Sequence, residues 1–200
     1  PPPSSSSHLR SSSVSSSSSP NTYTSLQVSF QPDLHAQLPT DLDLHQKAFI
    51  LFGRSATIQE EVAVKVSANM NKLEREFQLL RELYQHGRQV VRVFGTSVEL
   101  IDTVTTADGT SCSLYGFVME RGREDMEVYL RDRPSLLPLE RRVLANKLVS
   151  LVSFLHSHNK VWMDLKTSNL VHFPDQHPDW RLIDLADVAE CGQEMAEGQG

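Results

Sequence analysis

The polar loop over residues 161–169 constrains the fold of this chain more than any other segment. It reads Val-Trp-Met-Asp-Leu-Lys-Thr-Ser-Asn and lies between an expected helix and two short apolar runs, 170–173 and 181–183. We expect these runs to pair as a hairpin, with Asp184 directly after the second one. The residues that flank an antiparallel hairpin on its two strands lie close together. Asn169 and Asp184 should therefore converge and offer two oxygen ligands to Mg²⁺.

The same loop carries two further groups that suit chemistry on a phosphate. Asp164 can accept a proton, and Lys166 can steady a phosphate group. An ordinary polar loop is the alternative, and the position of these residues between a helix and a hairpin favours a functional site instead.

Two strands are expected near the start of the folded part. Residues 48–52 form an apolar run that a turn over 53–55 should close. Residues 61–66 alternate, which places three valines on one face and Ala63 and Lys65 on the other. The small side chain of Ala63 leaves room for a flat ligand beside the Lys65 ammonium, although Lys65 could equally be a solvated strand lysine.

A helix is expected directly after these strands. Residues 71–85 carry apolar side chains at helical spacing, and Glu76 lies at the border of that apolar stripe. A carboxylate facing a core is costly unless a cation meets it. Lys65 is the obvious partner, although a Glu76 side chain directed to water remains the alternative.

The other expected elements follow in order along the chain. Residues 90–94 and 114–119 have the composition of strands, with an Asp108-Gly109 turn between them. Residues 124–132 and 139–158 are expected to be helices.

Composition excludes several classes of protein. Residues 1–20 contain 12 Ser and 4 Pro, so we expect a disordered tail, followed by an irregular linker over 21–42. The net charge of −6, without a basic block, gives nucleic-acid binding no support. No apolar run approaches the ~20 residues of a membrane span. Two widely spaced cysteines form no disulfide framework or zinc site and indicate a reducing, cytoplasmic compartment.

The loop and the preceding strand resemble motifs of one family. Asp-Leu-Lys-Thr-Ser-Asn at 164–169 resembles the D-L-K-x-x-N catalytic loop of protein kinases, and Val-Ala-Val-Lys at 62–65 resembles their V-A-I-K strand. Phe-Leu-His at 154–156 and Val-Met-Glu at 118–120 extend the resemblance, which covers about 48–188.

The resemblance implies an α+β, bilobal protein kinase-like fold occupying 43–200. Its N-lobe would span 43–119, its hinge 120–123 and the first part of its C-lobe 124–200. The chain has neither an initiator Met nor a natural stop in composition at Gly200, so we expect the domain to continue beyond it.

The resemblance also implies roles for individual residues. Asp164 and Lys166 would be catalytic, and Asn169 and Asp184 would bind Mg²⁺. The residues implied in nucleotide binding are Lys65, Glu76, Ile50, Ala63, Met119, Glu120, Gly122 and Val171. The implied activity is transfer of the ATP γ-phosphoryl group to a Ser or Thr hydroxyl of a protein substrate, because Lys166 fits the Ser/Thr-specific pattern.

The sequence departs from the family pattern in four places. The expected glycine-rich loop, at 43–48, contains no glycine, and Trp162-Met163 replaces the His-Arg before the catalytic Asp. The D-F-G segment is Asp-Leu-Ala at 184–186, and Lys65 precedes Glu76 by only 11 residues. The glycine-free loop and Trp162-Met163 favour a rival function, a pseudokinase that binds nucleotide or serves as a scaffold without turnover.

Overall fold

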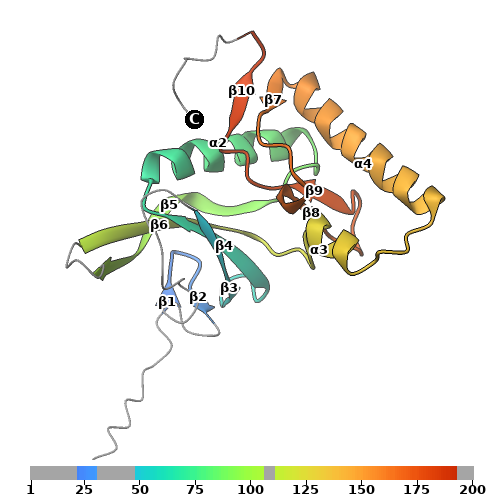
Figure 1. Ribbon diagram of the computed structural model, residues 1–200. Helices are drawn as coiled ribbons and strands as arrows, with labels where there is room; N and C mark the ends of the chain where they lie inside the picture. The colour runs from blue at the N-terminus through green and yellow to red at the C-terminus, as the bar shows by residue number, and fades with distance from the viewer. Residues whose placement is uncertain (1–21, 31–47, 106–110, 193–200) are drawn as a thin grey trace, which may run out of the picture.

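The computed structural model describes residues 22–30, 48–105 and 111–192, and it contains one antiparallel sheet of six strands with one helix, α2, packed along one face (Figure 1). The strand order is β1-β2-β3-β4-β6-β5. The strands are β1 Thr22–Tyr23, β2 Val28–Phe30, β3 Phe49–Ser55, β4 Glu61–Ser67, β5 Val93–Thr105 and β6 Ser111–Glu120. The α+β class expected from the sequence is confirmed.

The helix α2, Met70–His86, covers one face of this sheet. It begins where the Asn69 side chain accepts the backbone N–H of Lys72 at 3.0 Å, which satisfies one of the free donors of the first turn. It ends at Gly87. Leu73, Phe77 and Leu80 face the sheet and are fully buried, as the apolar spacing predicts, and Leu83 is buried beside them.

Strand β4 separates two hydrophobic clusters and is buried on both faces. Val62, Val64 and Val66 belong to a cluster with β2, β3 and β6. Ala63, on the opposite face, belongs to the cluster that includes the buried side of α2. Lys65 lies on this second face, so the strand delivers its ammonium beneath α2.

The remaining elements form a smaller unit beside the sheet. They are α3 Met126–Arg131, α4 Pro138–Ser157, β7 Lys160–Trp162, a 3-10 turn Thr167–Asn169, β8 Leu170–His172, β9 Trp180–Leu182 and β10 Val188–Glu190. β8 pairs with β9, and β7 pairs with β10. Two backbone hydrogen bonds connect this unit to the segments that flank the sheet: Arg123 N–H, after β6, donates to His172 O at 2.8 Å, and Val91 N–H, before β5, donates to Leu182 O at 3.1 Å.

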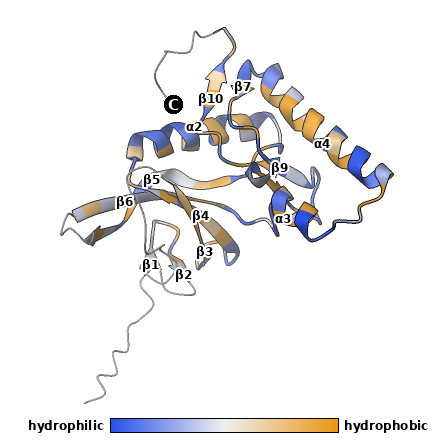
Figure 2. Ribbon diagram, viewed as in Figure 1, coloured by the Kyte–Doolittle hydropathy of each residue, from blue (hydrophilic) through white to orange (hydrophobic). Residues whose placement is uncertain are grey.

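Helix α4 is covered on only one side within the described residues. It buries Leu151 and Leu155, while Leu139, Val143 and Val149 remain exposed. Figure 2 shows apolar residues along much of this helix. None of the helices in the described ranges combines the length and apolarity that a membrane crossing requires.

Three sequence-based expectations need correction. The turn expected at 53–55 is strand, because these residues pair with β2. The glycine serves the close approach of β2 instead, since a Cβ on Gly53 would be 2.7 Å from Ser29 O. Of the strand expected at 90–94, only 93–94 belong to β5. The irregular linker expected over 21–42 is wrong for Thr22–Tyr23 and Val28–Phe30, two paired strands too short to show alternation. The expected disordered tail and the Asp108-Gly109 turn lie outside the described residues.

Candidate active site

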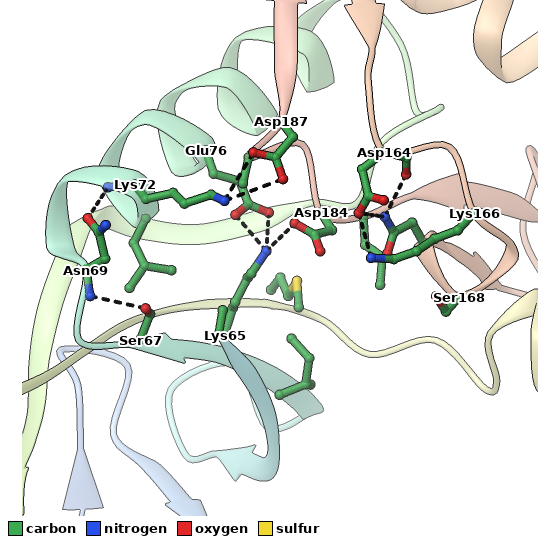
Figure 3. Close-up of a pocket in the computed structure, with 17 residues that line it drawn as sticks. Lys65, Ser67, Asn69, Lys72, Glu76, Asp164, Lys166, Ser168, Asp184 and Asp187 are labelled. Carbon is green, nitrogen blue, oxygen red and sulfur yellow. Dashed lines mark hydrogen bonds and ion pairs between the residues drawn. The ribbon is translucent and has the colours of Figure 1, made fainter. Parts of the chain in front are cut away.

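A cavity of about 410 Å³ lies between α2, the strands β3, β4 and β6, and the segments that follow β7 and β9 (Figure 3). Eight of the twelve site residues predicted from the sequence line it. They are Ile50, Lys65, Glu76, Met119, Asp164, Lys166, Asn169 and Asp184. Ile50 and Met119 give one part of the wall an apolar character, and the other six supply charge and amide groups.

The ammonium of Lys65 lies at the centre of a buried charge cluster. Its Nζ donates to both carboxylate oxygens of Glu76, at 2.7 and 2.8 Å, and to Asp184 Oδ1 at 2.8 Å. The Lys65 and Glu76 side chains are 7% and 1% exposed. The expected ion pair between them is therefore present, and the 11-residue spacing is long enough to form it.

Burial changes the proton affinity of Glu76. Removal of its carboxylate from water raises its pKa above the ordinary value of 4.5, and the negative charge of Asp184 acts in the same direction. The Lys65 ammonium and the N–H of Leu185, which donates at 3.3 Å, oppose this rise. Several partners therefore hold the Glu76 carboxylate at a buried position, where its ionised form is destabilised by loss of contact with water.

The two predicted metal ligands meet at the end of the β8–β9 hairpin. The N–H of Ile183 donates to the carbonyl of Asn169 at 2.9 Å, which ties Asn169 to the residue before Asp184. Asp184 has a φ of 57°, a left-handed conformation that Asp tolerates better than most residues. Both side chains line the cavity, as the hairpin geometry predicts.

Asp164 and Lys166 form a second, more exposed pair. Lys166 Nζ donates to Asp164 Oδ2 at 2.5 Å, and this bond lowers the pKa of Asp164 and raises the pKa of Lys166. Asn169 Nδ2 donates to the backbone carbonyl of Asp164 at 3.1 Å and to its Oδ2 at 3.3 Å. Asp164 is therefore an ionised carboxylate, oriented from two sides.

The protein offers two oxygen-bearing side chains to Mg²⁺, and substrate phosphates would have to supply further ligands. The Asn169 amide nitrogen is committed to Asp164, so Oδ1 is the atom that this side chain offers to a cation. Asp184 offers the second oxygen-bearing group. No cluster of three or more His, Cys, Asp or Glu in the described ranges is arranged to hold a metal. Mg²⁺ commonly binds through one or two protein ligands together with substrate phosphates, and this donor set matches that pattern.

The other four predicted residues do not line the cavity. Ala63 pairs with Met119 across β4 and β6 and is buried, and Val171 packs against Gly122 so closely that a Cβ there would be 2.0 Å from Val171 Cγ1. The N–H of Glu120 donates to Arg92 O at 2.9 Å. The carboxylate of Glu120 pairs instead with a buried arginine of β9, Arg181.

The cavity also has charged lining residues that our sequence analysis missed. Lys72, on the first turn of α2, forms an ion pair with Asp187, which follows Asp184 by three residues. Figure 3 shows both side chains beside Glu76. The position of Lys72 could have been predicted from the sequence, because it lies four residues before Glu76 and thus on the same helix face.

Comparison with known proteins gives a distant and partial relationship. No family model matches the chain. It is 26% identical over 114 residues to "Dual specificity protein kinase Ttk" of Danio rerio, covering 57% of this chain and 10% of that protein. It is 27% identical over 105 residues to "Dual specificity protein kinase TTK" of Mus musculus, covering 52% of this chain and 11% of that protein. The matches thus span about a tenth of these relatives' length and indicate a relationship to protein kinases.

Proposed function

We propose that this chain is part of a protein serine/threonine kinase, which transfers the γ-phosphoryl group of ATP to a hydroxyl group of a protein substrate. The proposal rests on one observation: Lys65, Asp164 and Asp184 line the same cavity. The distant similarity to proteins named as dual-specificity kinases supports the same class of reaction.

In this proposal the residues of the cavity share three tasks. Lys65, oriented by Glu76, binds phosphate oxygens of ATP, and Asn169 and Asp184 would hold Mg²⁺, which when bound would neutralise phosphate charge. Asp164 orients the substrate hydroxyl and accepts its proton as the hydroxyl oxygen bonds to the γ-phosphorus and ADP leaves. Lys166 stabilises the charge on the transferred group. Ile50 and Met119, which line the same cavity, supply apolar contact for the adenine ring.

The proposal includes the architecture of the family. The sheet with α2 would be the N-lobe, residues 120–123 the hinge, and α3 onward the start of a C-lobe. Cys112 and Cys191 are free thiols, which is compatible with a reducing compartment, and we propose the cytoplasm.

The test is phosphotransfer by the full-length protein, measured with Mg-ATP and matched peptides bearing Ser, Thr or Tyr. We expect transfer to Ser and Thr, and loss of at least about 10³-fold in Asp164→Asn, because the proton acceptor and its charge are removed. Asp175→Asn, an exposed carboxylate outside this cavity, is the matched control and should keep full activity. Transfer to Tyr peptides at a similar rate would contradict the Ser/Thr specificity alone.

A pseudokinase is the second candidate, and a specific observation favours it. Residues 43–48, where the family pattern has a glycine-rich loop, contain no glycine, the residue type that lets backbone amides approach phosphates closely. Nucleotide binding by the wild-type protein with turnover no higher than that of Asp164→Asn would establish this candidate and overturn the kinase.

A further inference from the structure

Three ammonium groups line the cavity among the described residues, and one of them has no role in the proposed function. Lys65 and Lys166 are assigned above. The third, Lys72, projects from the first turn of α2 toward the charged part of the cavity (Figure 3). It lines the same cavity as Asp164, Asn169 and Asp184.

Lys72 lies at a position in α2 where a lysine does not stabilise the helix. It is the third residue of α2, and the first turn contains no acidic residue. The N-terminus of a helix carries a partial positive charge, which stabilises anions and disfavours cations. Residues that break such a local rule are concentrated at functional sites.

Of the three lysines in the cavity, Lys72 has the longest ion-pair distances. Its Nζ lies 3.1 and 3.4 Å from the two carboxylate oxygens of Asp187, and both side chains are about half exposed, at 52% and 53%. The shortest N–O distances of Lys65 and Lys166 are 2.7 and 2.5 Å. Exposed pairs of this kind contribute only about 0–1 kcal/mol, so a phosphate oxygen can displace Asp187 at little cost.

We propose that Lys72 binds the terminal phosphates of the nucleotide, exchanging its contact with Asp187 for a phosphate oxygen. The inference rests on the proposed function, because it requires a nucleoside triphosphate in this cavity. It also gives the phosphates a cationic partner. The segment 43–48 lacks the glycines that would let backbone amides bind them closely.

The first experiment measures binding rather than activity. Calorimetric titration of the full-length protein with Mg-ATP and with adenosine separates phosphate contacts from base contacts. We expect Lys72→Ala to weaken ATP binding about tenfold, the loss typical of one charge-assisted contact, and to leave adenosine binding unchanged. Lys72→Arg should retain most of the ATP affinity. Equal weakening for ATP and adenosine would overturn the proposal.

A second variant distinguishes phosphate binding from a purely structural ion pair. Asp187→Asn releases Lys72 without removing it, so ATP binding should tighten about two- to threefold, in line with the small energy of an exposed pair. If Lys72 served only to hold α2 against the segment after Asp184, both variants would weaken ATP binding alike. Loss of an acid also reduces repulsion, so the gain must shrink when Asp187→Asn is combined with Lys72→Ala.

The controls keep this inference separate from the proposed function. Lys147→Ala removes a similar lysine–aspartate pair, with Asp179, outside the cavity, and should change neither affinity. Wild-type protein that binds ATP without transferring phosphate would overturn the kinase proposal. The titrations would still test whether Lys72 binds the phosphates. Wild-type protein that binds neither ligand would overturn both.

Discussion

Two ion pairs in the same cavity differ sharply in how they are held. The pair Lys65–Glu76 is almost fully buried, whereas the side chains of Asp164 and Lys166 are 39% and 49% exposed. The pKa of Glu76 is raised by burial, and the pKa of Asp164 is lowered by the hydrogen bond from Lys166. In one pair desolvation is the largest influence, and in the other it is the attraction between partners.

The two pairs also differ in what they connect. Lys65, Glu76 and Asp184 come from β4, α2 and the segment after β9, so their contacts join three parts of the chain. Asp164 and Lys166 are two residues apart in one loop. The buried cluster therefore depends on the whole fold, while the exposed pair requires only the loop, and substitutions should separate these two kinds of dependence.

Removal of one partner should give the largest difference between the pairs. Lys65→Met leaves the Glu76 carboxylate buried beside Asp184 without its cation, and we expect a loss of about 3–5 kcal/mol in the free energy of unfolding. Lys166→Met leaves Asp164 in contact with water, and the loss should stay below about 1 kcal/mol. Urea denaturation of both variants measures the difference, and equal losses would remove the distinction.

Removal of both buried partners should reverse most of that loss. In Lys65→Met/Glu76→Leu no charge of the pair remains to be desolvated, and apolar side chains of similar size often replace a buried ion pair at little cost. We expect the double variant to unfold at a urea concentration nearer to the wild type than Lys65→Met does, and to bind no ATP. A double variant as unstable as Lys65→Met would mean that the buried pair itself stabilises the fold.

The sequence anticipated the parts of the site whose geometry follows from local rules. The alternation in 61–66 places Lys65 beneath the following helix, and the hairpin after residue 169 brings Asn169 and Asp184 together. The pairing of Lys65 with Glu76 followed from the cost of an unpaired carboxylate facing a core.

Other features depend on contacts that no local pattern reveals. Strand β2 is three residues long and is stabilised by pairing with β3, so its sequence carries no period of its own. The side chain of Glu120 accepts from Arg181, 61 residues later, a choice set by tertiary packing. Lys72 was missed because its partner, Asp187, is 115 residues away.

The pH dependence of stability should have opposite signs for the two pairs. The raised pKa of Glu76 contributes stability that is complete below its ordinary pKa of 4.5 and is lost as the pH rises through the pKa in the folded protein. The lowered pKa of Asp164 contributes stability that is present above 3.8 and is lost as the pH falls through the pKa in the folded protein.

Difference curves against two amide variants measure these signs. The unfolding free energy of the wild type minus that of Glu76→Gln should decrease as the pH rises from 4.5 towards neutrality. The corresponding difference for Asp164→Asn should decrease as the pH falls below 3.8, and only slightly, since this carboxylate is partly solvated. Curves of the same sign would contradict the assignment of burial as the main influence on Glu76.

The smallest expected effect is that of salt on the coupling within each pair. Double-mutant cycles with alanine, measured at about 0.05 M and about 0.5 M NaCl, isolate the interaction energy of Asp164 with Lys166 and of Lys65 with Glu76. The exposed pair should couple by about 0.5 kcal/mol or less at low salt and by still less at high salt, because mobile ions screen solvated charges. The side chains of the buried pair are only 7% and 1% exposed, so its coupling should be larger and much less sensitive to salt. A buried coupling that falls with salt as the exposed one does would mean that water and ions reach Lys65, and that the two pairs differ in degree only.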